Sequence, residues 1–180
     1  PSIYATSRDV IEESLTLGPA DSEALLHQLP EQWGITAHEV LAASVGLAVR
    51  ETLAQGDAAS ILMESESHGR LLPHMDTSRT VGWLTSVYPV RISAESPVSD
   101  ASTTRACFES AVRSQRDIPF DGLGYGLLRY LAPSTREQMA NWPEAQVVFN
   151  FFGASATHAN GGAWLPDTRF EKELLGDDTS

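Results

Sequence analysis

The sequence predicts an α/β protein in which helices flank a mixed β-sheet in a two-layer arrangement. Three runs with the apolar, strand-like composition of sheet segments lie at 59–65, 86–92 and 146–152. Two longer segments, 36–54 and 100–116, space their apolar residues as amphipathic helices do. Strands and helices interleave without the strict repeat of βαβ units, which favours a mixed sheet.

The first 35 residues predict an edge strand and a short helix. In residues 10–17, leucines alternate with serine and threonine, the pattern of a strand at a sheet edge. A glycine–proline pair ends this run. A helix at 23–29, capped by a polar side chain before it, is expected to stop at Pro30. Residues 30–35 are then expected to form a loop.

The clearest helix covers 36–54. Thr36 and Glu39 form the T-x-x-E pattern of a capping box at its start. Gly56 suits its C-terminal end. Small residues at 42–46 would let this helix approach a neighbour closely. The apolar residues at helical spacing are Leu41, Val45, Ala48, Val49 and Leu53.

A second long helix follows a turn at 96–100. Ser99 or Asp100 can cap it, and it is expected to run to about Arg116. Its expected inward residues are Cys107, Phe108, Ala111 and Val112.

The segment after this helix predicts a loop and two short helices. Residues 117–126 are glycine-rich and are expected to form a loop. A helical run at 127–131 follows. Ser134 and Glu137 make a second capping box, which opens a helix to about residue 142. The tail after the last strand is expected to be irregular.

Composition excludes several classes of function. The 180 residues suffice for one domain or half of a larger one, and a net charge of −12 without a basic stripe argues against nucleic acid as a partner. The single cysteine excludes an intrachain disulfide. No apolar run approaches the roughly 20 residues of a membrane span, and no signal peptide is evident, so we expect a cytoplasmic protein. The chain starts without methionine and is expected to be a piece of a longer one.

The polar cluster after the strand at 59–65 is the first candidate for catalysis. Glu66, His68 and Arg70 occupy alternate positions, which on an extended strand would all project from one face. A carboxylate or imidazole held there could transfer protons to and from a substrate. The alternative is a solvated strand end in which Arg70 pairs with a carboxylate. Spacing alone leaves both interpretations open.

Other chemistries find little support. His68, His74 and Asp76 match no closed zinc pattern, so no metal site is expected. The sequence after His38 lacks the second histidine of H-E-x-x-H, and no G-x-S-x-G elbow occurs. The glycine-rich segment lacks the Lys-Ser/Thr of a P-loop. Asn150, within an apolar strand, is either a structural cross-link or part of a site.

Four motifs, taken in order, resemble those of the epimerization domains of non-ribosomal peptide synthetases. The sequence ESHGR at 66–70 resembles their E-G-H-G-R motif. Residues 76–89, DTSRTVGWLTSVYP, are similar to their D-x-S-R-T-V-G-W-F-T-x-x-Y-P stretch. PFDGLGYG at 119–126 and FNFFG at 149–153 resemble P-x-x-G-x-G-Y-G and F-N-Y-L-G. The four motifs together are more specific than any one of them.

The resemblance implies that the chain is half of a domain. Epimerization domains belong to the condensation-domain superfamily, which resembles chloramphenicol acetyltransferase and has two α/β subdomains around an active-site tunnel. The N-terminal subdomain carries an H-H-x-x-x-D-G motif, and no two of the five histidines here are adjacent. Residues 1–180 are therefore expected to form the C-terminal subdomain, whose first partner is the N-terminal subdomain of the same domain.

The implied reaction is inversion of the α-carbon of an aminoacyl or peptidyl thioester held on the phosphopantetheine arm of a peptidyl carrier protein. Glu66 aligns with the carboxylate that has an acid–base role in the family, and its partner would be the missing histidine. No cofactor is expected to bind directly, because the carrier supplies the arm, and the isolated chain is expected to be inactive. The residues expected to line the site are His68, Arg70, Trp83, Tyr125, Asn150 and Phe151.

Three positions depart from the family pattern. Ser67 replaces glycine, Leu84 replaces phenylalanine, and Phe151 replaces tyrosine and so lacks a hydroxyl. Two alternatives come from other classes: the C-terminal half of a condensation domain, which forms peptide bonds, or a non-catalytic module that docks carrier proteins. Glu66 and the R-T-V-G-W sequence at 79–83 favour epimerization.

Overall fold

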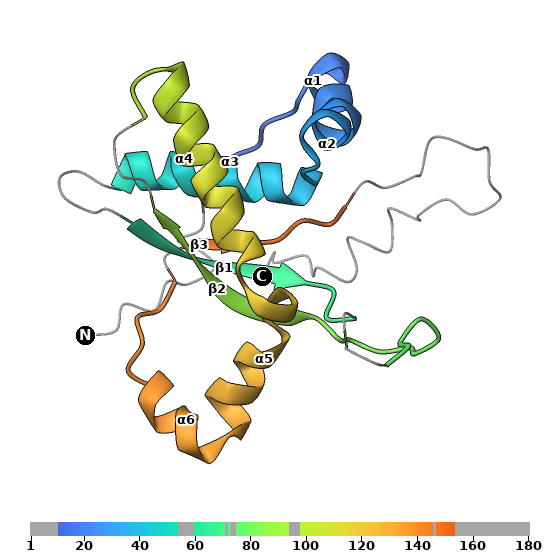
Figure 1. Cartoon of the computed structure of the whole chain (residues 1–180), viewed down its shortest axis with the longest axis vertical. Helices are drawn as coiled ribbons and strands as arrows, with labels where there is room; N and C mark the ends of the chain where they lie inside the picture. The colour runs from blue at the N-terminus through green and yellow to red at the C-terminus, as the bar shows by residue number, and fades with distance from the viewer. Residues whose placement is uncertain are drawn as a thin grey trace, which may run out of the picture. The chain divides into compact units, whose positions relative to one another are not determined.

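The central sheet has three strands in the order β2-β1-β3 within the part of the chain that the structure describes (Figure 1). This computed structural model describes residues 11–53, 60–70, 72, 75–93, 98–145 and 147–153. The strands are β1 (Ser60–Ser67), β2 (Ser86–Ser93) and β3 (Val147–Phe149). β1 pairs antiparallel with β2 and parallel with β3, which confirms the predicted mixed sheet.

One face of the sheet carries the core. Alternate side chains of β1 and β2 point to this face because strand side chains have a period of two. Helices α3 (Ala37–Leu53) and α4 (Ala101–Arg116) pack against it and against each other (Figure 1). The buried residues of β1 and β2 are Ile61, Met63, Ser65, Ser86, Tyr88, Val90 and Ile92.

The buried face of α3 is the side of small residues for which close approach is predicted. The capping box is confirmed: the Thr36 N–H donates to Glu39 at 2.7 Å, and the Glu39 N–H donates to the Thr36 hydroxyl at 3.2 Å. Val45 and Leu53, two of the apolar residues at helical spacing, are exposed. The small-residue side faces the sheet, which confirms the predicted close approach: a Cβ on Gly46 would lie 2.8 Å from Ile92 Cγ1. The residues buried on this side are Val40, Ala42, Ala43, Gly46, Leu47 and Arg50.

The N-terminal region contradicts two predictions. Residues 11–17 form no strand, and their apolar side chains are exposed. Helical structure continues through Pro30, because a π-helical turn precedes it and the missing N–H falls in the first turn of the next helix. Gly34, at φ 62°, ends that helix, so 30–35 is only partly a loop. The segments are α1 (Pro19–Glu23), the π-helix η2 (Ala24–Gln28) and α2 (Leu29–Trp33).

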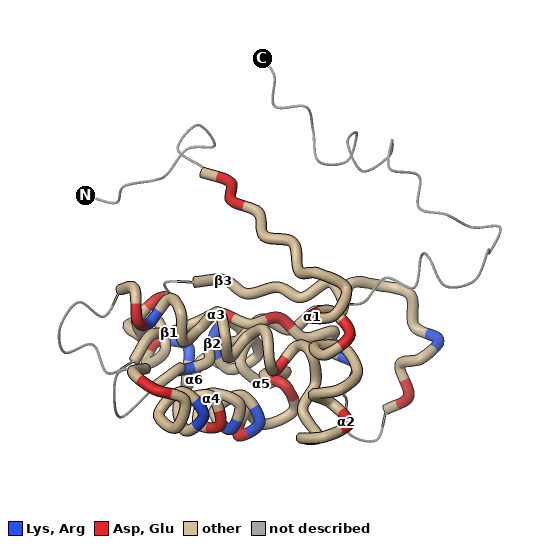
Figure 2. Tube along the Cα trace, turned by 90° about the horizontal axis from the view of Figure 1, so that it is seen from above, with Lys and Arg blue, Asp and Glu red and all other residues tan. Residues whose placement is uncertain are grey.

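α4 begins as predicted at Asp100. The Asp100 carboxylate accepts from the Ser102 and Thr103 N–H groups at 2.8 and 2.9 Å. Cys107, Ala111 and Val112 are buried, which confirms Cys107 as a small core residue. Basic residues recur along the trace of this helix (Figure 2), with two of its arginines in the last turn.

The segment after α4 is more helical than predicted. The glycine-rich segment 117–126 contains a 3₁₀ turn and a helix. The capping box of Ser134 and Glu137 is not formed: Pro133 is the first helical residue and Ala132 the N-cap. The elements are η3 (Pro119–Gly122), α5 (Leu123–Gly126), the π-helix η4 (Leu127–Leu131) and α6 (Pro133–Met139).

The chain divides into two units, residues 1–149 and 150–180. In the second unit the structure describes 150–153, which form no regular structure, so β3 is shorter than the predicted strand. Gly56, positions 96–97 and the tail after 153 lie outside the described residues. No helix in the described part is long and apolar enough to cross a membrane.

Candidate active site at the end of β1

Glu66 lies near the end of β1 on the sheet face opposite the core. Met63 and Ser65 point into the core, so Glu64 and Glu66 project to the other face. In the antiparallel pair, Glu66 is opposite Val87 on β2. Glu66 is half-buried. Ser67, one of the three departures from the family pattern, is the last residue of the strand.

The predicted alternation stops after Ser67. Gly69 adopts φ 63°, and this turn takes His68 and Arg70 off the strand. His68 is exposed, and its Nδ1 accepts from the Arg70 N–H at 3.0 Å. The expectation that Glu66, His68 and Arg70 share one strand face is therefore wrong, because the strand ends before the second of them.

Arg70 binds a loop rather than a carboxylate among the described residues. Its Nη1 donates to the carbonyls of Thr77 and Thr80 at 3.0 and 2.9 Å, and its Nη2 donates to the Gly82 carbonyl at 3.4 Å. The Thr77 hydroxyl donates back to the Arg70 carbonyl at 3.2 Å. The loop carries Trp83, whose side chain is 90% exposed.

His38 on α3 supports β1 from the core side. Its ring is hydrogen-bonded to the Glu66 main chain and lies edge-on to Phe149, with centroids 5.4 Å apart. Burial lowers the pKa of His38, and Glu39, Asp121 and the Glu66 backbone only partly oppose this. From the sequence, His38 was considered only as the first histidine of an incomplete H-E-x-x-H zinc pattern. No local pattern signals its contact with a strand 28 positions away (66 − 38).

A left-handed turn packs on Tyr88 at the same end of the sheet. Phe120, Asp121 and Gly122 have φ of 51°, 45° and 70°. A Cβ on Gly122 would lie 2.0 Å from Tyr88 Cγ, so only glycine lets the turn sit on the ring. The Ser86 hydroxyl donates to the Asp121 carbonyl at 3.0 Å. Burial raises the pKa of Tyr88.

Tyr125 reaches the sheet face that carries Glu66. With Leu62, Glu64 and other residues it lines a cavity of about 260 Å³. Arg129 lies over the Tyr125 ring, 5.8 Å from its centroid. Since Glu64 and Glu66 share a face, Tyr125 belongs to the same side of the protein as the candidate carboxylate.

Asn150 and Phe151 follow β3. β3 runs parallel to β1, with Phe149 opposite Ser65 in the register. Asn150 is exposed and Phe151 half-buried. Both belong to the second unit, and their role in the site stays a prediction.

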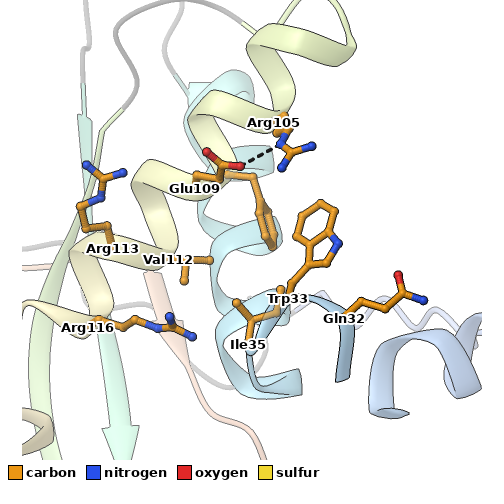
Figure 3. A pocket seen from close by; sticks show the side chains of 9 residues that line it. Gln32, Trp33, Ile35, Arg105, Glu109, Val112, Arg113 and Arg116 are labelled. Atoms are coloured by element: carbon orange, nitrogen blue, oxygen red, sulfur yellow. Dashed lines mark hydrogen bonds and ion pairs between the residues drawn. The ribbon is translucent and has the colours of Figure 1, made fainter. Parts of the chain in front are cut away.

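A larger cavity, of about 540 Å³, lies between α2 and α4 (Figure 3). Trp33 projects into it from the end of α2, with the Arg105 guanidinium 5.1 Å from its ring and the Phe108 ring 6.5 Å away. Arg116 is held by Glu39 and by the Gly34 carbonyl at 2.7 Å. None of the predicted site residues lines this cavity.

The expectation that the chain holds no metal site stays a prediction. Within the described segments no group of three or more histidine, cysteine, aspartate or glutamate side chains could hold a metal ion. His74 lies outside those segments. The Asp76 carboxylate accepts from the Ser78 N–H at 2.9 Å, which holds the pKa of Asp76 below its usual value and shapes the loop.

Known synthases contain sequences similar to this chain. It is 33% identical over 156 residues to a linear gramicidin synthase of Brevibacillus parabrevis, and the match covers 84% of this chain and 3% of that protein. It is 36% identical over 141 residues to chondramide synthase cmdD of Chondromyces crocatus, and this match covers 77% and 3%. The chain thus spans only a small part of these relatives.

Two solved structures resemble the fold. The epimerization domain from the third module of tyrocidine synthetase B superposes with a TM-score of 0.60 at 26% identity, covering 74% of this chain and 29% of that one. The first condensation domain of the CDA synthetase gives 0.53 at 17% identity, covering 80% and 30%, a likeness of fold alone. The family model for the condensation domain matches residues 5–161. The chain therefore belongs to the condensation domain family.

Proposed function

We propose that the chain is the C-terminal subdomain of an epimerization domain in a non-ribosomal peptide synthetase. In this role it helps to invert the α-carbon of an aminoacyl or peptidyl thioester carried by a peptidyl carrier protein. The N-terminal subdomain of the same domain supplies the other half of the site. The substrate arrives on the carrier's phosphopantetheine arm, and the protein works in the cytoplasm.

The setting of Glu66 carries this proposal. It is a half-buried carboxylate on the sheet face away from the core, and its side chain has no ion pair within the described segments. His38 contacts its main chain from behind, and Gly69 turns the chain immediately after the strand. The strand thus presents Glu66 from a well-supported backbone.

Inversion needs two proton transfers at one carbon. The thioester acidifies the α-hydrogen, so one group can remove this proton to give a planar enolate-like intermediate, and another group returns a proton from the opposite face. We assign one of these two roles to Glu66. The other role belongs to a group on the absent subdomain. The oxyanion of the intermediate needs hydrogen-bond donors, and the resemblance of FNFFG to F-N-Y-L-G makes the Asn150 amide our candidate for one of them. His68, Trp83, Tyr125 and Phe151 complete the lining.

The comparisons support epimerization over condensation. The epimerization domain of tyrocidine synthetase B has the higher TM-score and identity of the two structures. The ESHGR and RTVGW sequences at 66–70 and 79–83 agree with this choice. Condensation is the second candidate, because the matching family is that of condensation domains.

The stereochemistry of a carrier-bound substrate tests the proposal. The synthetase that contains this chain is loaded with an L-aminoacyl group in D₂O, and the released amino acid is separated by chiral chromatography. Epimerization predicts a mixture of D and L forms with deuterium at the α-carbon. Condensation predicts retained L configuration and a dipeptidyl thioester when an acceptor carrier is added. Carrier binding without either product would identify a docking module and contradict the proposal.

A further inference from the structure

The Arg70 guanidinium makes an unusual set of contacts for an arginine beside a candidate catalytic carboxylate. Its hydrogen bonds go to three main-chain carbonyls, those of Thr77, Thr80 and Gly82, at 2.9–3.4 Å. The Thr77 hydroxyl returns a hydrogen bond to the Arg70 carbonyl, and Thr77 is buried. One side chain therefore ties the turn that follows β1 to a loop 7 to 12 positions ahead.

The loop has few other restraints. Its internal hydrogen bonds in the described part include Thr80 N–H to the Thr77 carbonyl at 3.0 Å and Ser78 N–H to Asp76 at 2.9 Å. Val81 and Trp83 are 100% and 90% exposed, so their side chains do not hold it by packing. After Trp83, the main chain of Leu84 packs against Gly69. Before Trp83, the loop is held chiefly by the hydrogen bonds from Arg70 to the carbonyls of Thr80 and Gly82.

We propose that Arg70 is a positioning residue: it fixes the loop at 76–84 and so sets Trp83 at the end of β1 that carries Glu66. A planar guanidinium presents five N–H donors in a rigid fork, so one head group can serve several carbonyls. A lysine has a single nitrogen and cannot span them. An aromatic side chain held in advance loses less conformational entropy when a substrate or subdomain covers it.

The effect on catalysis rests on the proposed function, whereas the restraint of the loop belongs to this chain alone. Arg70 acts through the loop and does not transfer a proton. Its loss should raise KM more than it lowers kcat, and Glu66 should show the reverse. Two separate readouts can therefore distinguish failure of this inference from failure of the proposed function.

Fluorine NMR on the 180-residue chain tests the restraint. The chain has four tryptophans, so 5-fluorotryptophan gives four resonances, and Trp83→Phe assigns one of them. Arg70→Gln should sharpen the Trp83 resonance and move it toward that of free tryptophan, while the other three stay in place. Arg79→Gln, an exposed arginine in the same loop, is the matched control and should change none of the linewidths. An unchanged Trp83 resonance in Arg70→Gln would overturn the proposal.

A second variant covers the case in which Arg70→Gln unfolds the chain. Thr77→Val removes only the hydroxyl that donates to the Arg70 carbonyl. The proposal predicts a sharper Trp83 resonance with the other three unchanged, and a Trp83 linewidth equal to wild type would contradict it.

In the synthetase, Arg70→Gln should lower kcat/KM for α-proton exchange by about tenfold or more, mainly through KM. Methylguanidinium added to Arg70→Gly should restore part of this loss, and Arg79→Gln should match wild type. A loss confined to kcat, or no rescue, would contradict a positioning role. If wild type exchanges no α-proton, the proposed function fails, while the NMR result on the loop still decides the restraint.

Discussion

Gly69 and Leu84 meet main chain to main chain. A Cβ added to Gly69 would lie 1.6 Å from the Leu84 carbonyl oxygen and 3.2 Å from the Ser86 nitrogen. Gly69 also has φ 63°, a conformation that costs other residues about 1–2 kcal/mol. This contact joins the turn after Glu66 to the start of β2, so the glycine of the ESHGR sequence is required by both its conformation and its neighbours.

Gly69→Ala should destabilise the protein by about 2–4 kcal/mol, because the methyl group must displace main-chain atoms. Urea unfolding measures the loss. Gly124→Ala is the matched control, since a Cβ there has nothing within 4 Å and lies in a helix, where alanine is favoured. Equal stability of the two variants would contradict the close approach of Gly69 to Leu84.

Glu39 should give an acid-dependent contribution to stability. Burial pushes the pKa of Glu39 upward, but hydrogen bonds from Arg116 and Thr36 outweigh it, and the pKa lies below the ordinary value of 4.5. Because the pKa of Glu39 is lower in the folded state than in the unfolded state, the ionised carboxylate stabilises the folded protein fully above about pH 4.5. This contribution to the free energy of unfolding is lost as the pH falls through the folded-state pKa. Glu39→Gln should therefore cost about 1 kcal/mol at pH 7, after allowance for solvent screening.

Urea unfolding at several pH values measures this difference. Wild type and Glu39→Gln should converge toward pH 3, while the exposed Glu137→Gln should match wild type throughout. A difference that stays constant from neutral pH down to pH 3 would show that the carboxylate charge of Glu39 does not contribute.

His38 should make the protein less stable just below neutral pH. Burial lowers its pKa below 6.5, so the unfolded chain takes up a proton at a higher pH than the folded protein does. The His38 contribution is thus complete above pH 6.5 and declines as the pH falls. Between pH 7.5 and 5.5, wild type should lose about 0.5–1 kcal/mol more than His38→Gln. His27→Gln, at an exposed position, should keep the wild-type slope; an equal slope in His38→Gln would refute the assignment.

The local rules of helix and strand formation predicted most of the sheet and both long helices. Capping at Thr36 and at Asp100 depends on residues three positions apart, and strand patterns depend on alternation, so both can be read from sequence. The predicted end of the helix at Pro30 was wrong because the preceding π-helical turn lets the helix continue. The small residues at 42–46 correctly indicated a close approach of α3 to a neighbour, and the structure shows that the neighbour is Ile92 on β2.

Candidate site residues could be found from the sequence only where the type of side chain marks them. The place of Glu66 on a strand could be predicted from the sequence and is confirmed, whereas its acid–base role stays a prediction. The role of Arg70 could not be predicted, since its acceptors are main-chain carbonyls that every residue possesses. The contact of His38 with the Glu66 main chain was missed for the same reason.

Solvent deuterium exchange at the substrate α-carbon tests the central claim most directly. The synthetase that contains this chain is loaded with an aminoacyl group in D₂O, and Glu66→Gln is compared with Glu64→Gln. Both glutamates lie on the same face of β1, two positions apart. Each variant removes one carboxylate charge from this face, so a difference in exchange rate reports the position of the carboxylate. We predict that Glu66→Gln loses on the order of 100-fold or more in exchange rate and that Glu64→Gln stays within about threefold of wild type. Equal exchange by Glu66→Gln and wild type would contradict the acid–base role of Glu66.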